Sequence, residues 1–168
     1  MSTMANPMDA LHDFQRALNA GMSVNHLDAG YIERLDDIAS GRRFCYAKVV
    51  AGEVHVLVTF GSEDQIKGVD CYSVNYAVGE KHRGRGLAVE AVNKGIEEIK
   101  KHYRRAKINK FYVDAIADVR NVHSIEVAKK IFPKPGIAAR DLFSGTPSRY
   151  FLQLYSCLVA GEGIEDLS

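Results

Sequence analysis

Residues 69–91 of the chain have the sequence VDCYSVNYAVGEKHRGRGLAVEA, and this stretch decides the fold. Its first part, Val69 to Val78, is rich in Val and Tyr, as β-strands are. A glycine-rich segment follows, and from Leu87 onward the apolar residues recur at helical spacing. The stretch therefore predicts a strand that leads through a glycine-rich turn directly into a helix.

The glycine-rich turn has the composition of an anion site. It consists of Arg83, Gly84, Arg85, Gly86, Leu87 and Ala88. The first N–H groups of a helix have no partners within the helix, and the helix dipole adds positive charge at this end. The glycines place no Cβ in the way of a pyrophosphate, the alanine lets the first helical turn pack closely, and the arginines add charge. The turn therefore predicts phosphate binding.

Other kinds of site also use glycine-rich turns. A Rossmann fingerprint needs a glycine at position 89, which is Val89 in this chain. A Walker A motif needs Gly-Lys-Ser or Gly-Lys-Thr, which the sequence lacks. The Arg-Gly-Arg-Gly segment alone leaves open an RNA-contacting basic loop or an ordinary solvent-exposed turn.

Regular elements are expected on both sides of this stretch. Apolar spacing predicts helices at Met8–Leu18, Tyr31–Ala39, Leu87–Tyr103 and Ile125–Phe132. Alternation predicts strands at Arg42–Val50, Val54–Phe60, Val69–Val78, Phe111–Ala117 and Tyr150–Leu154, with a weaker strand at Ile137–Phe143. Gly41 is expected to end the second helix, Gly61–Gly68 to form a loop, and Gly161–Ser168 to be a frayed tail.

The composition limits the classes of partner. Lys and Arg total 22 against 21 Asp and Glu, so the formal charge is +1, and nucleic acid and membrane surfaces are disfavoured as partners. The N-terminal segment lacks the apolar region of a signal peptide, and no stretch has about 18 uninterrupted apolar residues. We expect one cytoplasmic domain spanning residues 1–168, and the sequence leaves a homodimer open.

Cysteines and histidines give no metal signature. Cys45, Cys71 and Cys157 are odd in number and far apart, which favours reduced, buried thiols over disulfides or a zinc site. The spacing of the six histidines predicts no metal ligation, so no metal is assigned. The basic segment Tyr103–Lys110 is expected to be a solvated helix end, with a ribosomal, acidic-protein or cofactor-phosphate contact as the alternative.

The pattern Arg-x-x-Gly-x-Ala at 83–88 resembles the acetyl-CoA signature of the GNAT superfamily of N-acetyltransferases. Tyr76-Ala77-Val78 lies where the strand of that family bonds the pantetheine arm, and Asn121 lies in a similar Asn-x-x-Ser segment. The resemblance covers Val69 to Phe132. Residues 86–91 and 121–130 are most similar to the branch of ribosomal-protein N-terminal acetyltransferases.

The resemblance implies an α/β fold with a mixed, largely antiparallel sheet of six or seven strands, helices on both faces, and a V-shaped opening. It implies acetyl-CoA as cofactor and acetyl transfer to a primary amine, on a protein N-terminus or a small molecule. The residues expected to bind the cofactor are Tyr76, Ala77, Val78, Arg83, Gly84, Arg85, Gly86, Leu87, Ala88 and Asn121. The second hypothesis is a non-catalytic acyl-CoA-binding module, and the third is an RNA-contacting domain.

The catalytic groups of the family are partly replaced in this chain. Many members have a Tyr, which protonates the departing thiolate, at the position of Ala128. In the branch that this chain resembles, that role is assigned to the residue at the position of Ser124. Helix capping is the structural alternative for Ser124 and for Asn121. Several members have a Glu where this chain has Tyr72, which together with Ser124 is taken as a candidate catalytic residue.

The general base is left open among Asp70, Glu80, Asp114 and His123. Deprotonating an α-amine with a pKa near 8 costs about 1.4 kcal/mol at pH 7, against about 4.6 kcal/mol for a lysine. A site without an evident base therefore favours an amine of low pKa. The acceptor pocket is expected from the segments Met8–Ser40 and Ile137–Ser148.

Overall fold

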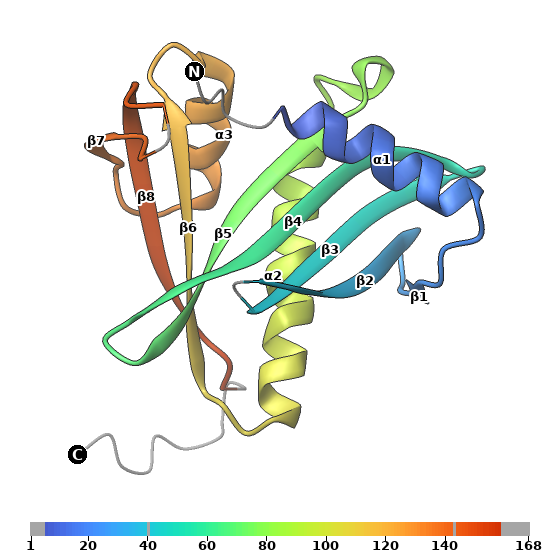
Figure 1. The fold of residues 1–168 in the computed structure, drawn as a ribbon, viewed down its shortest axis with the longest axis horizontal. Coiled ribbons are helices and arrows are strands. Elements are labelled where there is room, and N and C mark those ends of the chain that lie inside the picture. The colour runs from blue at the N-terminus through green and yellow to red at the C-terminus, as the bar shows by residue number, and fades with distance from the viewer. Residues whose placement is uncertain (1–5, 40, 143, 159–168) are drawn as a thin grey trace.

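A computed structural model describes residues 6–39, 41–142 and 144–158 (Figure 1). Within these residues the helical elements are α1 (Pro7–Asn19), the short 3₁₀ helix η1 (Glu80–His82), α2 (Leu87–Arg105) and α3 (Val122–Ile131). The strands are β1 (Asn25–His26), β2 (Tyr31–Ile38), β3 (Gly41–Val50), β4 (Glu53–Ile66), β5 (Val69–Val78), β6 (Lys110–Asp118), β7 (Ile137–Arg140) and β8 (Pro147–Ser156). None of the described helices is long and apolar enough to cross a membrane.

The described strands form one eight-stranded sheet in the order β1-β2-β3-β4-β5-β6-β8-β7. Among them, β5 and β6 form the parallel pair, and the register joins only Cys71–Ser73 to Tyr112–Asp114. Beyond these residues β5 continues to Val78 along β4, and β6 continues to Asp118 along β8. The two strands therefore diverge, and the sheet opens as a V (Figure 1).

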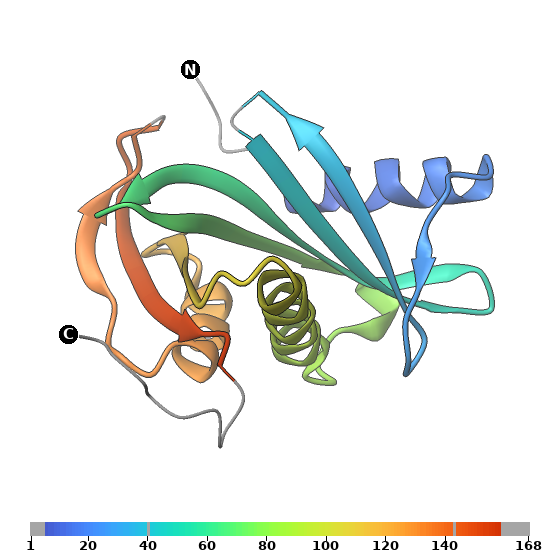
Figure 2. The ribbon, with the colours of Figure 1, turned by 90° about the horizontal axis from the view of Figure 1, so that it is seen from below.

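Helices cover both faces of the sheet, so each face has its own apolar core. Helices α2 and α3 pack on one face and α1 packs on the other (Figure 2). The core under α2 and α3 includes Phe44, Tyr46, Val56, Val58, Phe60, Val92, Ile96, Ile99, Phe111 and Phe151. The core under α1 includes Leu11, Phe14, Ile32, Cys45, Ala47, Leu57 and Ala77. The predicted α/β class, with a largely antiparallel sheet and helices on both faces, is confirmed, and the described strands number eight rather than six or seven.

The predicted second helix is wrong, because Tyr31–Ile38 forms strand β2. This segment pairs with β3 along its whole length, from Tyr31 opposite Lys48 to Ile38 opposite Gly41. Pairing with a neighbouring strand satisfies its backbone groups, which outweighs the weak helical spacing of its apolar residues. Gly41, expected to end a helix, instead begins β3 with a φ of 133°.

The predicted loop at Gly61–Gly68 is also largely strand. Strand β4 runs on to Ile66 and forms a hairpin with β5 through Lys67 and Gly68, whose φ angles are 49° and 77°. Two left-handed residues in succession are typical of a tight hairpin turn. The polar residues of this arm suit a strand because the hairpin projects beyond the helices (Figure 1). The remaining predicted elements match α1, β3, β5, α2, β6, α3 and β8, and β7 falls within the predicted weak strand, of which Phe143 lies outside the described residues.

Gly95 allows α2 to lie close to the sheet, and we expect Gly95→Ala to destabilise the protein. A Cβ at this position would lie 2.4 Å from a ring carbon of Phe60 and 2.9 Å from one of Tyr46, both fully buried. Overpacking costs about 1–3 kcal/mol, whereas the better helix propensity of alanine returns about 1 kcal/mol. Urea unfolding should show a lower free energy of unfolding, while Asn93→Ala, at an exposed position of α2, should leave it unchanged or raise it. A Gly95→Ala protein as stable as the wild type would contradict this packing.

Candidate functional site

A cavity of about 360 Å³ lies where β5 and β6 separate. Its lining comes from both diverging strands, from α3, and from the residues at the start of α1. These residues are Asn6, Pro7, Val74, Asn75, Tyr76, Ala115, Ile116, Ala117, Asp118, Asn121, Ser124, Ala128, Ile131 and Phe132. Below, this space is called the cleft.

The turn predicted to bind phosphate has the required backbone geometry. Gly84 and Gly86 have φ angles of 78° and 72°, a left-handed conformation that favours glycine. No described atom lies within 4 Å of a Cβ built on either glycine, so the space outside the turn is open. Gly86 precedes α2, and no side chain of the described residues caps this helix. The first N–H groups of α2 therefore remain available to an anion.

Two arginines belong to this turn, and one of them is held against the end of β5. The Nε of Arg83 donates to the backbone oxygen of Val78, 3.3 Å away, at the end of β5. Arg85 is exposed beside it. Both guanidinium groups add positive charge next to the free N–H groups of α2, as an incoming pyrophosphate requires.

The tripeptide Tyr76-Ala77-Val78 occupies the last positions of β5, beyond the residues that pair with β6. Of the three, Tyr76 lines the cleft, and its hydroxyl donates to the backbone oxygen of Ser124 at 3.3 Å. Burial raises the pKa of Tyr76, so its hydroxyl remains a donor. The bond from Tyr76 ties β5 to α3 across the opening. Ala77 instead packs into the core under α1.

Asn121 and Ser124 both line the cleft. The Asn121 side-chain oxygen accepts from the backbone N–H of Ser124 at 3.1 Å, so Asn121 caps α3, as the structural alternative proposed. Capping and contact with a ligand are compatible, because the cap lies at the wall of the cleft. Ala128, at the position where many GNAT members have a Tyr, lies one turn further along the same wall.

Tyr72, by contrast, lies in the core beneath α2. Its hydroxyl is 2.6 Å from that of Tyr103, which in turn donates to Asp70 at 2.6 Å. Its ring packs edge-on against Phe44 and Phe111, and burial raises its pKa. Tyr72 is absent from the described lining of the cleft. The structure thus brings Ser124, Asn121 and Tyr76 together and places Tyr72 elsewhere.

A second cavity of about 360 Å³ shares the lining residue Ile116 with the cleft. It is lined by Glu63, Asp64, Ile66, Cys71, Ser73, Asp114, Ile116, Ala139, Arg140, Asp141, Leu142 and Tyr150. Below, it is called the acidic cavity. Part of the segment Ile137–Ser148, expected to form an acceptor pocket, contributes to it through β7.

Asp114 is the candidate base that lines the acidic cavity. Its carboxylate accepts hydrogen bonds from the hydroxyl of Ser73 and from that of Tyr150 at 2.8 Å, and lies 3.7 Å from the Cys71 thiol. Burial, and then the charge of Asp114, raise the pKa of Glu63, which is on β4, two strands away in the sheet. A carboxyl with a raised pKa is a better proton acceptor than an ordinary one. Sequence reasoning missed Glu63, because it lay in the predicted loop.

The other candidate bases lie elsewhere. The carboxylate of Asp70 accepts from Tyr103 and, at 2.8 Å, from Gln65. Glu80 and His123 are exposed, on η1 and on α3. None of these three is in the described lining of the cleft or of the acidic cavity.

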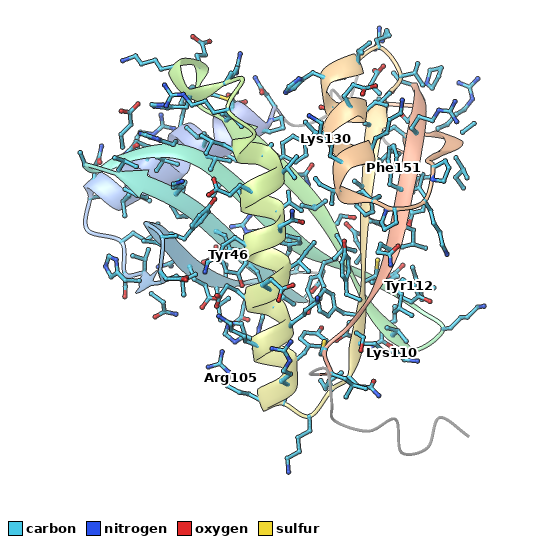
Figure 3. The ribbon with its side chains drawn as sticks, turned by 180° about the vertical axis from the view of Figure 1, so that it is seen from behind. Tyr46, Arg105, Lys110, Tyr112, Lys130 and Phe151 are labelled. Atoms are coloured by element: carbon cyan, nitrogen blue, oxygen red, sulfur yellow. The ribbon has the colours of Figure 1, made fainter. Side chains whose placement is uncertain are left out.

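The basic segment Tyr103–Lys110 lies at the opposite end of α2 from the glycine turn, as Arg105 and Lys110 show in Figure 3. The 19 residues of α2 make these two ends about 28 Å apart. Another cavity, of about 620 Å³, lies beside α3, and Lys129, Lys134, Arg149, Phe132 and Phe151 are among its lining residues. Neither feature joins the cleft to the turn.

Comparisons with known proteins identify the fold. No family model matches the sequence, and no curated protein matches it. A GNAT-family acetyltransferase from Streptococcus pneumoniae is 13% identical over 91% of this chain and 98% of its own, with a TM-score of 0.52. The ribosomal-protein-S5-alanine acetyltransferase from Vibrio fischeri is 11% identical over 79% and 96%, with a TM-score of 0.53.

A third similar structure, described as a GnaT-family acetyltransferase from Bordetella pertussis, is 20% identical with a TM-score of 0.49. Its match covers 66% of this chain and 64% of that protein, so the chain spans less than two thirds of that protein's length. The Streptococcus pneumoniae and Vibrio fischeri structures support the assignment of the fold, and the chain has the GNAT fold.

The thiols give a test of the packing around the site. Burial raises the pKa of Cys45 to about 11 and that of Cys71 to about 12. At pH 8, on the order of one Cys45 thiol in a thousand is then ionised, against roughly a quarter of ordinary cysteines. We expect iodoacetamide to label both thiols far more slowly in the folded protein than in guanidinium chloride, as mass spectrometry would measure. Rapid labelling of Cys71 in the folded protein would show that the acidic cavity holds a reactive thiolate.

Proposed function

We propose that the protein transfers an acetyl group from acetyl-CoA to a primary amine. The observation that carries this proposal is the coincidence of two features at one end of the molecule. The cleft opens where β5 leaves β6, and β5 itself leads through η1 into the open glycine turn at the start of α2. An extended molecule could place its pyrophosphate at the glycine turn and its thioester, further along its length, in the cleft. The GNAT fold is consistent with this use.

The cofactor side of the proposal assigns roles to the predicted residues. The backbone N–H groups at Leu87 and Ala88, with Arg83 and Arg85, hold the pyrophosphate. The backbone of Tyr76–Val78, which has no strand partner on the side of β6, bonds the amides of the pantetheine arm. The arm then lies along the cleft, and its thioester reaches the wall formed by α3.

The chemistry joins the amine nitrogen to the thioester carbonyl carbon and breaks the carbon–sulfur bond. Unpaired backbone N–H groups of β5 polarise the carbonyl oxygen, which is worth a few kcal/mol in a site that excludes water. The Ser124 hydroxyl donates a proton to the departing thiolate, directly or through water. The products are an acetamide and the thiol of CoA.

We propose that the acceptor amine enters through the acidic cavity. Its ammonium form is attracted by Asp114 and Glu63, and one of these carboxylates accepts the proton that the amine must lose. Burial and the charge of Asp114 raise the pKa of Glu63, so Glu63 is the better proton acceptor of the two. Tyr72 is given no catalytic role here, because its hydroxyl bonds Tyr103 in the core.

A non-catalytic acyl-CoA-binding module is the second candidate. The observation that favours it is the presence of Ala128 in the wall of the cleft, where many members of the family have a Tyr. Such a module would bind acetyl-CoA and transfer nothing. The Vibrio fischeri protein with the same fold acts, by its name, on a ribosomal protein, so ribosomal N-terminal peptides belong among the acceptors tested.

Calorimetric titration with acetyl-CoA and with CoA tests the cofactor site. We expect micromolar binding to the wild type, weaker binding to Arg85→Ala, and no binding to Gly86→Trp, whose side chain occupies the turn. Arg105→Ala, at the exposed far end of α2, is the matched control and should bind as the wild type does. Circular dichroism verifies that each variant is folded. A folded wild type that binds neither molecule would overturn the proposal.

Turnover separates the two candidate functions. We expect acetylation of α-amines to exceed that of internal lysines, since the α-amine costs less to deprotonate. Ser124→Ala should lower kcat by about 10²-fold or more and leave the acetyl-CoA affinity unchanged, because proton donation acts in the transition state. Lys130→Ala, exposed in the last turn of α3, is the control. Binding of acetyl-CoA without turnover on peptides, polyamines, amino acids or antibiotics would favour the binding module.

A further inference from the structure

A cluster of potential metal ligands lies outside both the cleft and the acidic cavity. It consists of Glu53 and His55 at the start of β4 and His82 at the end of η1. The two imidazole rings are stacked, with centroids 3.5 Å apart and planes 14° apart. The Nε2 of His82 is 3.0 Å from a carboxylate oxygen of Glu53. One ligand atom from each residue lies within 4.8 Å of the other two.

His82 is the fixed member of the cluster. Its side chain is buried, with 8% of the residue exposed, and its Nδ1 has no hydrogen-bond partner among the described residues. A buried polar nitrogen without a partner costs free energy, so the hydrogen bonds of the described residues alone do not account for the position of this ring. In its neutral form an imidazole offers a lone pair to a metal.

We propose that Glu53, His55 and His82 bind Zn²⁺ or a similar divalent transition metal. Two imidazoles and one carboxylate are a usual set of three protein ligands for zinc, with water in the fourth position. Zinc–ligand distances of about 2.0–2.2 Å place tetrahedral ligand atoms about 3.3–3.5 Å apart. Rotations of the exposed Glu53 and the partly exposed His55 would bring their atoms to that separation, while His82 keeps its place.

The surrounding backbone shows what such a metal would do. The N–H of Gly79 donates to the oxygen of His55 at 2.9 Å, and the N–H of His82 donates to Gly79 at 2.9 Å. A Cβ at Gly79 would lie 3.3 Å from the His82 ring, so the glycine leaves room for it. The first of these bonds already holds the start of η1 against β4. A metal shared by His55 and His82 would fasten η1 more firmly and thereby fix the segment that continues into the glycine turn.

Nearby cations limit the affinity. Lys48, Lys81 and Arg85 are close enough to act electrostatically on Glu53 or His55. Their positive charge opposes a divalent ion, so we expect micromolar rather than tighter binding.

Titration of the metal-free protein with ZnCl₂ at neutral pH, followed by calorimetry, tests the site. We expect one saturable site in the wild type, and an affinity at least tenfold lower in His55→Gln and in Glu53→Gln. Both substitutions are at accessible positions, whereas His82 is buried and its replacement risks the fold. His12→Gln and His26→Gln, at exposed positions that do not belong to the cluster, should bind zinc as the wild type does.

Two further measurements identify the ligands. Co²⁺ in place of Zn²⁺ should give the visible absorption of a tetrahedral site, absent in His55→Gln, and Zn²⁺ should raise the Tm of the wild type but not of His55→Gln. The inference is overturned if the wild type shows no saturable zinc binding, if His55→Gln binds equally well, or if Mg²⁺ competes as an equal. These readouts need no acetyl-CoA and no acceptor, so they stand whether or not the protein transfers an acetyl group.

Discussion

The short parallel junction between β5 and β6 is the constraint on which the rest of the structure depends. Each strand pairs over a longer stretch with its other neighbour: β5 pairs with β4 out to Val78, and β6 pairs with β8 out to Asp118. The two antiparallel ladders lead away from each other, so the parallel contact ends at Ser73 and Asp114. The cleft, its unpaired backbone groups and the place of α3 on its wall all follow from this early end of pairing.

The sequence was most informative where function and local geometry use contiguous residues. The strand, the left-handed glycines and the uncapped helix start all lie within Val69–Ala91, so each could be predicted from its neighbours along the chain. The segment Tyr31–Ile38 was predicted wrongly because its state depends on β3, a partner that local spacing does not contain. The polar arm of β4 was mistaken for a loop, since its residues from Gly61 to Ile66 are exposed or half-buried and lack the apolar and polar alternation of a half-buried strand.

The candidate site also has a part built from contiguous residues and a part built from residues far apart in the sequence. Its cofactor wall comes from one run of sequence, whereas the acidic cavity combines Glu63, Asp114 and Tyr150 from three strands whose proximity depends on sheet register. The cluster of Glu53, His55 and His82 is likewise formed by the return of η1 to the start of β4. No spacing rule for metal ligands covers such a contact, which explains why the histidines gave no signal in the sequence.

The missing side chain at Gly95 has a consequence for the other end of its helix. Helix α2 is a stiff rod that touches the rings of Tyr46 and Phe60 at this residue, and its first residue, Leu87, lies about 12 Å away along the axis. Residues of α2 on both sides of Gly95, from Leu87 to Tyr103, also pack on this core. A larger side chain at position 95 would push the middle of the helix away from the sheet and shift the glycine turn with it. The absence of a side chain at position 95 therefore helps to align the start of α2 with the end of β5.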